Sequence, residues 1–344
     1  MKAQVLRAIV KSLEENPEPL ELADLPIPEP GFGEILIRVR ACGICRTELD
    51  EIEGRIRPKL PVIPGHQIVG IVEGSGPGTS RFERGERVGI AWIHSACGEC
   101  RHCRRGNENL CDQFRGTGCD VDGGYAEYTI VPEDFAYPIP ERFSDSQAAP
   151  LLCAGAIGYR ALGLTGMEDG DTLALYGFGA SNHIVLQMAK YKYPSSKIFV
   201  FTKRGDDPPA RLARELGADW VGATGEAPPE KYDRAIDTTP FGDVIKAALR
   251  HLEDGGRLVI NNIRKETPIR ELEYADCLWG EKEVKSVKNI TRRDVREFLQ
   301  LAAEIPIVPE ITEFRLEEAN RALLALKRGE YRGAGVLKIA GRSP

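Results

Sequence analysis

Four cysteines near residue 100 form the strongest local pattern in the chain that could do chemistry. They are spaced as Cys97-x-x-Cys100-x-x-Cys103-x7-Cys111. Four thiolates complete the tetrahedral shell of a zinc ion, and two-residue gaps allow consecutive cysteines to turn around one ion. Because such a shell leaves no position for a substrate, the spacing predicts a structural zinc. Free thiols, two disulfides and an iron–sulfur cluster are the alternatives for this pattern.

Two histidines lie close to these cysteines in the sequence, His94 and His102. Since four cysteines already fill a zinc shell, we expect both histidines at the surface, with no part in metal binding. No role is assigned to Cys119 or Cys277.

Three more potential metal ligands, Cys45, His66 and Cys153, are far apart in the sequence. Cys45 follows an expected strand, His66 follows a Pro-Gly turn, and Cys153 lies where the character of the sequence changes. Any one of them alone is more often a packed core residue than a metal ligand. Spacing therefore does not assign these three residues to one site.

A glycine-rich segment, Gly177-x-Gly179-x-x-Asn182, lies between an expected strand and an expected helix. The first glycine permits a tight turn, the second lets the backbone approach a pyrophosphate, and the helix N-terminus favours negative charge. The third position usually has glycine for close packing of helix and strand, but here it has Asn182. The pattern predicts a dinucleotide-binding loop formed by Gly177, Gly179, Ala180, Ser181 and Asn182.

The choice between NAD and NADP is expected at the end of the following strand. An acidic residue about 20 residues after the glycines usually bonds the ribose hydroxyls of NAD. Here the strand ends in Thr202, Lys203 and Arg204, and the first acid is Asp206. A hydroxyl followed by two cations suits a 2′-phosphate, so the sequence favours NADP(H). The alternative is that the two cations form a solvated loop and NAD binds without the acid.

The elements that must position these residues differ along the chain. Up to about residue 153, short strands such as 35–40, 68–73 and 87–92 are separated by Pro and Gly, which is typical of a partly closed β-barrel. From 154 to about 290, strands alternate with helices, which predicts an α/β fold with a doubly wound parallel sheet. Residues 291–344 are too few for a domain. We expect them to return to the first one.

Composition limits the classes of partner. The formal net charge of −6 argues against nucleic acid. No stretch approaches the roughly 18 uninterrupted apolar residues that span a membrane, and the first residues do not resemble a secretory signal. We therefore expect a soluble, cytoplasmic protein without nucleic-acid or membrane partners.

The order of these segments resembles the zinc-containing alcohol dehydrogenases of the medium-chain dehydrogenase/reductase family along nearly the whole chain. In that family a Cys-Gly-x-Cys-x-Thr segment, a Pro-Gly-His segment and a later Leu-x-Cys-Ala-Gly segment supply the ligands of a catalytic zinc. The resemblance implies that these ligands are Cys45, His66 and Cys153, and that the four-cysteine lobe holds a structural zinc. Each chain would then bind two zinc ions.

The resemblance also implies three regions. They are a GroES-like catalytic domain at 1–153 with its zinc lobe at about 94–115, a Rossmann nicotinamide-binding domain at 154–290, and a return to the catalytic domain at 291–344.

Several residues near the expected catalytic zinc match family positions, with departures. Thr47 matches the hydroxyl that takes the alcohol proton, and Arg46 matches a position that often contacts the cofactor pyrophosphate. Glu48 stands where the family usually has Asp as the partner of the zinc-bound histidine. Gln67 replaces a Glu, and Asp50 replaces a His that ends the proton relay. These departures leave the expected metal ligands in place but change residues of the expected proton path.

The resemblance implies reversible hydride transfer between a small alcohol and its aldehyde or ketone, with NADP or NAD, in a homodimer or homotetramer. Segments 51–60 and 274–280 are expected to line the substrate pocket. Three alternatives are open. The chain could be a polyol dehydrogenase or another zinc reductase of the same family, a non-catalytic metal-binding protein on this scaffold, or an iron–sulfur electron carrier.

Overall fold

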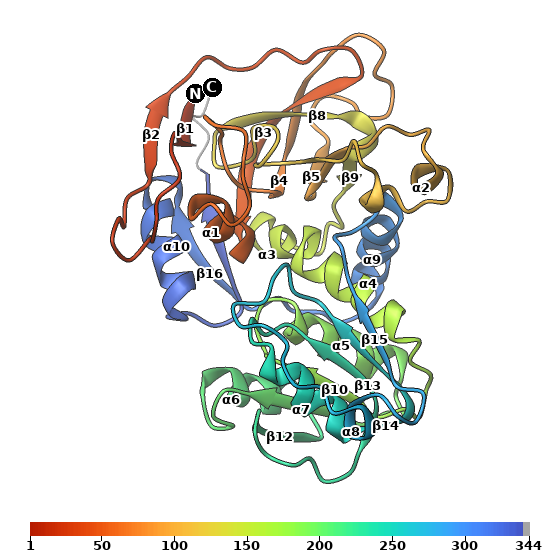
Figure 1. Ribbon diagram of the computed structural model, residues 1–344. Helices are drawn as coiled ribbons and strands as arrows, with labels where there is room; N and C mark the ends of the chain where they lie inside the picture. The colour runs from red at the N-terminus through yellow and green to blue at the C-terminus, as the bar shows by residue number, and fades with distance from the viewer. Residues whose placement is uncertain (340–344) are drawn as a thin grey trace. The chain divides into compact units, whose positions relative to one another are not determined.

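The computed structural model describes residues 1–339, which form two compact units (Figure 1). Among the described residues, unit 1 contains 1–153, 289–303 and 309–339. Unit 2 contains residues 154–288 and 304–308.

Unit 1 is built on a mixed sheet of seven strands, in the order β16-β17-β3-β4-β5-β9, with β8 also paired to β3. The strands are β3 (Glu34–Ile44), β4 (Gln67–Ser75), β5 (Arg87–Ile90), β8 (Tyr128–Pro132), β9 (Ala136–Pro138), β16 (Ile311–Arg315) and β17 (Ala334–Lys338). Two small sheets accompany it, made of β1 (Lys2–Leu6) with β2 (Leu20–Asp24), and of β6 (Ile93–Ser95) with β7 (Arg115–Gly116). The last strand, β17, pairs antiparallel with the end of β3, so the C-terminal segment joins the N-terminal sheet.

The helices of unit 1 are short and lie at the ends of these strands. They are α1 (Arg46–Ile52), α2 (Arg101–Arg104), α3 (Asp145–Ala148), α9 (Arg292–Glu304) and α10 (Ala319–Arg328), with 3₁₀ turns η1 (Glu108–Leu110), η2 (Glu133–Phe135), η3 (Ala149–Leu152) and η4 (Leu316–Glu318). Strand β3 is longer than the predicted 35–40 because its last residues, 41–44, are buried between two neighbours, β4 and β17. A strand covered on both faces loses the apolar–polar alternation that marks its first half.

Unit 2 has a six-stranded sheet in the order β12-β11-β10-β13-β14-β15, in which all neighbours are parallel. The strands are β10 (Leu173–Tyr176), β11 (Ile198–Thr202), β12 (Trp220–Ala223), β13 (Tyr232–Asp237), β14 (Leu252–Ile260) and β15 (Glu283–Ser286). The helices are α4 (Ala154–Thr165), α5 (Asn182–Lys192), α6 (Pro208–Glu215), α7 (Asp243–His251) and α8 (Tyr274–Cys277). The order reverses between β10 and β13, which confirms the predicted doubly wound sheet.

Aromatic side chains fill one face of this parallel sheet beneath α7 and α8. Tyr176 stacks on Phe201 with ring centroids 4.2 Å apart, and the Tyr176 hydroxyl lies 2.9 Å from that of Tyr232. All three rings belong to one buried cluster with apolar residues of α7. Tyr176 and Phe201 lie at or next to the carboxyl ends of β10 and β11, so this packing fixes the strand ends after which the proposed cofactor residues follow.

Residues 274–280 lie at the opposite end of unit 2 from the 177–182 loop. The amide of Gly255, near the start of β14, donates to the carbonyl of Gly280 over 2.7 Å. The 177–182 loop follows the carboxyl end of β10, whereas this contact is at the amino end of the sheet. The segment is therefore remote from the edge at which the cofactor loop lies, and the expectation that 274–280 lines the substrate pocket is wrong.

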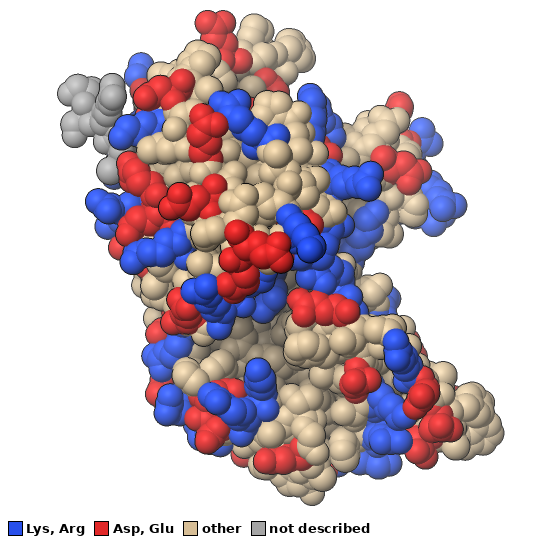
Figure 2. All heavy atoms as spheres, turned by 60° about the vertical axis from the view of Figure 1, so that its left-hand side comes forward, with Lys and Arg blue, Asp and Glu red and all other residues tan. Residues whose placement is uncertain are grey.

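One helical stretch of the described residues, 145–165, has the length and hydropathy of a membrane span, but 67% of its most apolar window is buried within the protein. A core helix gives the same signal. On the face shown in Figure 2, acidic and basic side chains are interspersed without a large field of one sign.

Candidate metal and cofactor sites

Cys45, His66 and Cys153 converge in unit 1. Their ligand atoms lie within 4.8 Å of one another, and His66 Nε2 lies 3.3 Å from Cys153 Sγ. Atoms bound to one tetrahedral ion at about 2.0–2.3 Å are separated by distances of this order. Two sulfurs and one imidazole nitrogen fit zinc, and three donors leave a fourth position open.

Strand pairing explains why residues so distant in sequence meet. The end of β3 pairs with the start of β4, with Gly43 opposite Gln67. Cys45 follows β3 and His66 precedes β4, so both lie at the same edge of the sheet. The short turn η3, which packs on β3 and β4, ends at Cys153 and delivers its thiol to that edge.

The pKa values of the three residues depend on one another, and only that of Cys45 moves in the direction that metal binding requires. Hydrogen bonding with Cys45, together with burial, raises the pKa of Cys153 well above normal. Hydrogen bonding with Cys153 and with His66 holds the pKa of Cys45 well below its usual value. Burial lowers the pKa of His66, but Glu48 and Cys45 outweigh it and raise that pKa well above normal. A metal binds the thiolate form of cysteine, so the lowered pKa of Cys45 favours metal binding.

Glu48 lies behind the ligands and contacts two of them. Its Oε2 accepts a hydrogen bond of 2.7 Å from the amide of Cys45, as the third residue of a helix does in a capping box. Its Oε1 lies 2.7 Å from His66 Nδ1 and forms an ion pair with the imidazole when that ring is protonated. The extra methylene relative to Asp is accommodated because the carboxylate reaches across the N-terminus of α1.

Gln67 is buried beside the same strand end. Its side chain packs on Gly43, where an added Cβ would lie 2.8 Å from Gln67 Cδ, so no larger residue fits at position 43. Gln67 Oε1 has no hydrogen-bond partner among the described residues.

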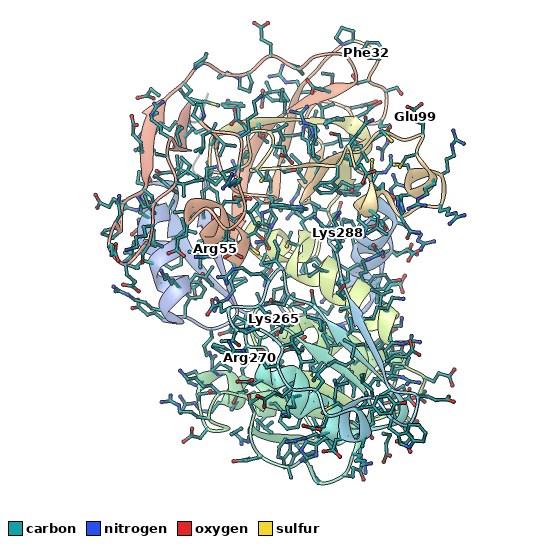
Figure 3. All side chains as sticks on the ribbon, in the orientation of Figure 1. Phe32, Arg55, Glu99, Lys265, Arg270 and Lys288 are labelled. Atoms are coloured by element: carbon teal, nitrogen blue, oxygen red, sulfur yellow. The ribbon has the colours of Figure 1, made fainter. Side chains whose placement is uncertain are left out.

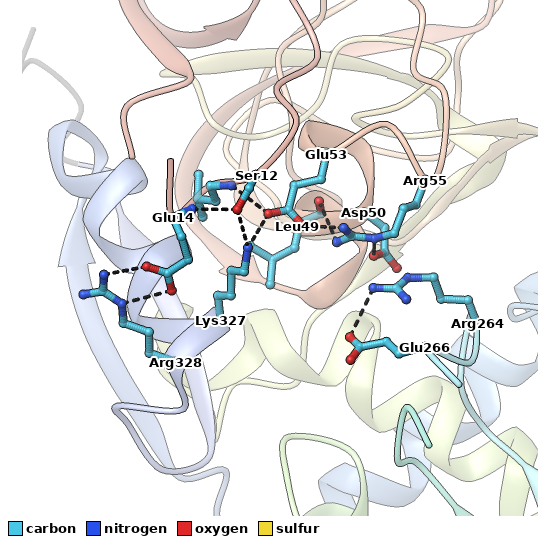
Figure 4. Close-up of polar contacts among 11 residues, drawn as sticks. Ser12, Glu14, Leu49, Asp50, Glu53, Arg55, Arg264, Glu266, Lys327 and Arg328 are labelled. Atoms are coloured by element: carbon cyan, nitrogen blue, oxygen red, sulfur yellow. Dashed lines mark hydrogen bonds and ion pairs between the residues drawn. The ribbon is translucent and has the colours of Figure 1, made fainter. Parts of the chain in front are cut away.

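The two residues expected in the proton path lie on α1. Thr47 Oγ1 is 3.5 Å from Cys45 Sγ, and its side chain is buried. Asp50 is also buried and pairs with Arg55, whose Nε lies 2.5 Å from Oδ1 (Figure 4). Arg55 also pairs with Glu53, which bonds Lys327 of α10, so this network ties α1 to the C-terminal segment.

Sequence reasoning missed two residues near the metal ligands. The ring of Trp92 packs edge-on against His66, with centroids 4.7 Å apart and planes at 86°. Glu51 is 1% exposed, and burial raises the pKa of its carboxyl well above normal. The sequence predicts Trp92 only as the end of an ordinary strand and Glu51 only as the first residue of the pocket-lining segment 51–60, so it links neither to the candidate metal ligands.

The four cysteines of the lobe also converge, beside Glu99 in Figure 3. Sulfur pairs lie 3.5 Å apart for Cys97 and Cys111, and 3.6 Å apart for Cys100 and Cys103. Backbone amides donate to three of the sulfurs, those of Cys97, Cys100 and Cys111. Hydrogen bonds from the Cys100 and Glu99 amides lower the pKa of Cys97 to about 7. All four thiols are free of disulfides, and the arrangement suits one tetrahedral ion enclosed by protein.

His94 is not at the surface, and that expectation is wrong. It is 6% exposed and lies in β6, which pairs with β7 at the base of the lobe. Burial and the nearby Arg115 lower its pKa to about 4, so it is neutral at physiological pH. His94 is buried where β6 pairs with β7. The cysteine spacing, from which the surface position was inferred, gives no information about this pairing. His102, on α2, is partly exposed.

The glycine loop of unit 2 joins β10 to α5. Gly177 has φ of +78°, and an added Cβ would lie 2.8 Å from Thr238 Oγ1. Nothing lies within 4 Å of the Cβ position of Gly179, so its backbone is open to a ligand. Asn182 Nδ2 donates to the Gly177 carbonyl over 2.7 Å. The side-chain amide of Asn182 therefore joins the first residue of α5 to the glycine loop. The usual pattern has a third glycine at this position.

The end of β11 presents two exposed cations. Lys203 and Arg204 are exposed and form no ion pair with any residue that the structure describes. Thr202 is buried, and its hydroxyl accepts a hydrogen bond from the Gly205 amide over 3.0 Å. Asp207 caps α6 by accepting from the Ala210 amide. Its carboxylate is therefore committed to the helix. Arg46, in unit 1, is exposed at the start of α1.

Comparisons with known proteins agree with this architecture. A family model described as the alcohol dehydrogenase GroES-like domain matches residues 31–141. The chain is 45% identical over 327 residues to a probable alcohol dehydrogenase of Mycobacterium tuberculosis, covering 93% of each protein. It is 36% identical over 343 residues to an alcohol dehydrogenase of Geobacillus stearothermophilus, covering 95% of this chain and 98% of the relative.

Solved structures show the same fold over the whole chain. A NAD-dependent alcohol dehydrogenase has a TM-score of 0.90 at 25% identity, covering 99% of this chain and 100% of its own. A cobalt- and zinc-bound thermostable alcohol dehydrogenase from Pyrobaculum aerophilum has a TM-score of 0.86 at 25% identity, covering 98% and 99%. The predicted combination of a GroES-like domain with a Rossmann domain is confirmed. This chain belongs to the alcohol dehydrogenases of the medium-chain dehydrogenase/reductase family.

Proposed function

We propose that the protein is a zinc-dependent alcohol dehydrogenase in which Cys45, His66 and Cys153 hold the catalytic zinc. The observation that carries this proposal is the convergence of these donors to within 4.8 Å in a chain of this family. Three protein ligands leave one tetrahedral position for an alcohol or carbonyl oxygen. Zinc bound there supplies Lewis acidity to that oxygen, which favours loss of the alcohol proton or polarises the carbonyl.

Thr47 is the proposed first acceptor of the alcohol proton, because its hydroxyl lies beside Cys45 in the buried site. Asp50 is the proposed end of the proton path. Its partner Arg55 has a side chain 31% exposed, so the ion pair adjoins solvent, into which the carboxylate would release the proton while the guanidinium keeps its own.

The proposed hydride carrier is NADP(H), bound at the 177–182 loop of unit 2. The pyrophosphate would lie at the N-terminus of α5, with Arg46 as a further contact, and the 2′-phosphate beside Thr202, Lys203 and Arg204. The exposed, unpaired state of the two cations among the described residues supports this choice. Arginine near this position is a known means of accepting a 2′-phosphate.

The four-cysteine lobe is the proposed site of a structural zinc, the second zinc of each chain. Its role would be to hold together a segment whose helices, α2 and η1, have only four and three residues. Thiols free of disulfides throughout the chain support a reducing, cytoplasmic location.

A homodimer or homotetramer is proposed from the free edge of the unit 2 sheet. β15 is the last strand in the sheet order, and all four of its residues are exposed. Exposed apolar side chains gather in the segment around it. They include Tyr274, Trp279 and Val284, which are 62%, 66% and 43% exposed. An open edge strand with apolar neighbours is suited to pairing with a second copy.

The decisive experiment combines metal analysis with a paired cofactor assay. Zinc per chain is counted in purified protein, and reduction of a panel of short aldehydes is followed separately with NADPH and NADH. We expect two zinc ions, turnover with a preference for NADPH, and loss of one zinc with all turnover in Cys153→Ser. Cys277→Ser removes a buried thiol from unit 2 and serves as the matched control, with two zincs and full activity.

Two outcomes would change the proposal. A preference for NADH would keep the enzyme and discard the role of Lys203 and Arg204. One zinc per chain with no turnover on either cofactor would indicate a metal-binding scaffold that lacks the reaction.

A further inference from the structure

A buried ion pair lies in unit 2 outside the sites described so far. Asp237, the last residue of β13, is completely buried. Lys265, labelled in Figure 3, lies in the segment that follows β14. Its Nζ donates to Asp237 Oδ2, and also to the carbonyl of Thr239 over 2.6 Å. The Lys265 side chain is only 13% exposed.

Both oxygens of Asp237 are used. Oδ1 accepts from the amide of Thr239 over 2.9 Å and from its hydroxyl over 2.7 Å. Burial raises the pKa of Asp237, and Lys265 opposes this shift. A carboxylate buried in this way depends on its cation, because no water replaces the lost hydration.

The ion pair joins two loops into one unit, which we call the two-loop unit and define as residues 238–242 and 261–268. Besides Lys265, the amide of Glu266 donates to the Pro240 carbonyl over 2.6 Å, and the amide of Gly242 donates to Thr267 Oγ1 over 2.7 Å. An added Cβ at Gly242 would lie 2.2 Å from the carbonyl oxygen of Pro268. The loops are therefore in close backbone contact, and the ion pair of Lys265 with Asp237, the residue just before the first loop, adds a charged tie to it.

The two-loop unit also touches the glycine loop. Thr238 Oγ1 donates to the Tyr176 carbonyl over 3.0 Å and lies 3.3 Å from Asn182 Nδ2. Asn261 Nδ2 donates to Ser181 Oγ over 3.2 Å. These contacts place the unit at the carboxyl ends of β10, β13 and β14, the edge at which doubly wound sheets bind their ligands.

We propose that the Lys265–Asp237 pair is a latch that holds the two-loop unit in the shape that receives the nicotinamide dinucleotide, which makes Lys265 a positioning residue for the cofactor. The proposal rests on the proposed function, since it assumes that unit 2 binds such a cofactor. The physical basis is that removal of Lys265 leaves an uncompensated buried carboxylate. The loops must then open to hydrate or protonate it.

The first test uses hydrogen–deuterium exchange on cofactor-free protein, so it does not depend on activity. In Lys265→Met we expect the amides of 238–242 and 261–268 to exchange at least about tenfold faster. The matched control is Lys197→Met, which removes a lysine from an exposed pair with Glu230, where the side chains are 57% and 46% exposed. Exchange in Lys265→Met equal to that in Lys197→Met would overturn the latch.

The second test measures the dissociation constant of NADPH, and of NADH, by quenching of protein fluorescence. We expect binding in Lys265→Met to be about tenfold or more weaker, and the double variant Asp237→Asn/Lys265→Met to recover part of the loss because it no longer buries an unpaired charge. The double variant also serves if Lys265→Met does not fold.

The two proposals fail in different ways. Wild-type protein that binds neither cofactor would refute the proposed function. Wild-type binding with an unchanged dissociation constant in Lys265→Met would refute the latch alone.

Discussion

The carboxylate of Glu48 lies 2.7 Å from the imidazole Nδ1 of His66, and both side chains are buried. The same carboxylate accepts the amide hydrogen of Cys45. One residue therefore orients His66, the proposed zinc ligand, and fixes the start of the helix that carries Thr47. This link between helix capping and metal geometry is the basis of the first prediction.

Glu48→Gln should weaken zinc binding at the catalytic site by about 10–100-fold, because outer partners of metal ligands have effects of this size. Glu48→Asp keeps the charge but shortens the reach, so it should retain more zinc than Glu48→Gln. Competition with a chelator, followed by metal analysis, measures both. Glu83→Gln, an exposed residue of unit 1, is the control. Equal zinc retention in Glu48→Gln and Glu83→Gln would contradict the role of Glu48.

Lys203→Ala/Arg204→Ala should raise KM for NADPH by about 100-fold or more and leave KM for NADH almost unchanged. The physical reason is that charge-assisted bonds to a 2′-phosphate contribute roughly 1.5–3 kcal/mol each, and NADH has no such group. Arg211→Ala, which removes an exposed cation from α6, should change neither value. An equal rise in KM for NADPH and for NADH would show that the two cations do not bind the 2′-phosphate.

His94 should make the fold sensitive to acid. Its pKa is about 4 in the folded state and about 6.5 when unfolded, so the unfolded chain takes up a proton first as pH falls. The contribution of neutral, buried His94 to the free energy of unfolding is fully present above about pH 6.5. It is lost as the pH falls to 4, and the loss amounts to up to about 3 kcal/mol.

Urea unfolding at several pH values, in wild type and in His94→Gln, measures this contribution as the difference between the two. The variant should lose less stability on acidification. His102→Gln, at a partly exposed position on α2, should behave as wild type. If His94→Gln and wild type lose stability in parallel, the buried histidine is not responsible.

Val284→Glu should convert the proposed oligomer into single chains. Val284 is 43% exposed on the edge strand β15, and a charge on an edge strand prevents pairing with another strand. Light scattering during size-exclusion chromatography gives the mass directly. Val308→Glu places the same charge at a position 60% exposed outside the sheet and should leave the assembly intact. An oligomer that persists in Val284→Glu would place the interface elsewhere.

Local sequence patterns were sufficient wherever a structure depends on neighbours in the chain. The alternation of strands and helices after residue 154 predicted the parallel sheet, because each strand–helix–strand unit is encoded within about 30 residues. The four cysteines at 97–111 are close enough in sequence for spacing to suggest one ion, and the structure brings their sulfurs together.

Other features depended on parts of the chain that are far apart. Cys45, His66 and Cys153 gave no shared pattern, and only the pairing of β3 with β4 and the position of η3 bring them together. The burial of His94 and the contact of Trp92 with His66 likewise follow from packing between strands. The Lys265–Asp237 pair joins residues 28 positions apart, and in the sequence Lys265 is one of several charged residues in a row.

The sequence by itself determined the composition of the sites, meaning which donors, glycines and cations the chain can offer. Tertiary structure decided which of them meet and which are withdrawn from water. The physical reason is that a residue type and its spacing specify local geometry, whereas burial and long-range contact are set by the pairing of strands and the packing of helices across the whole unit.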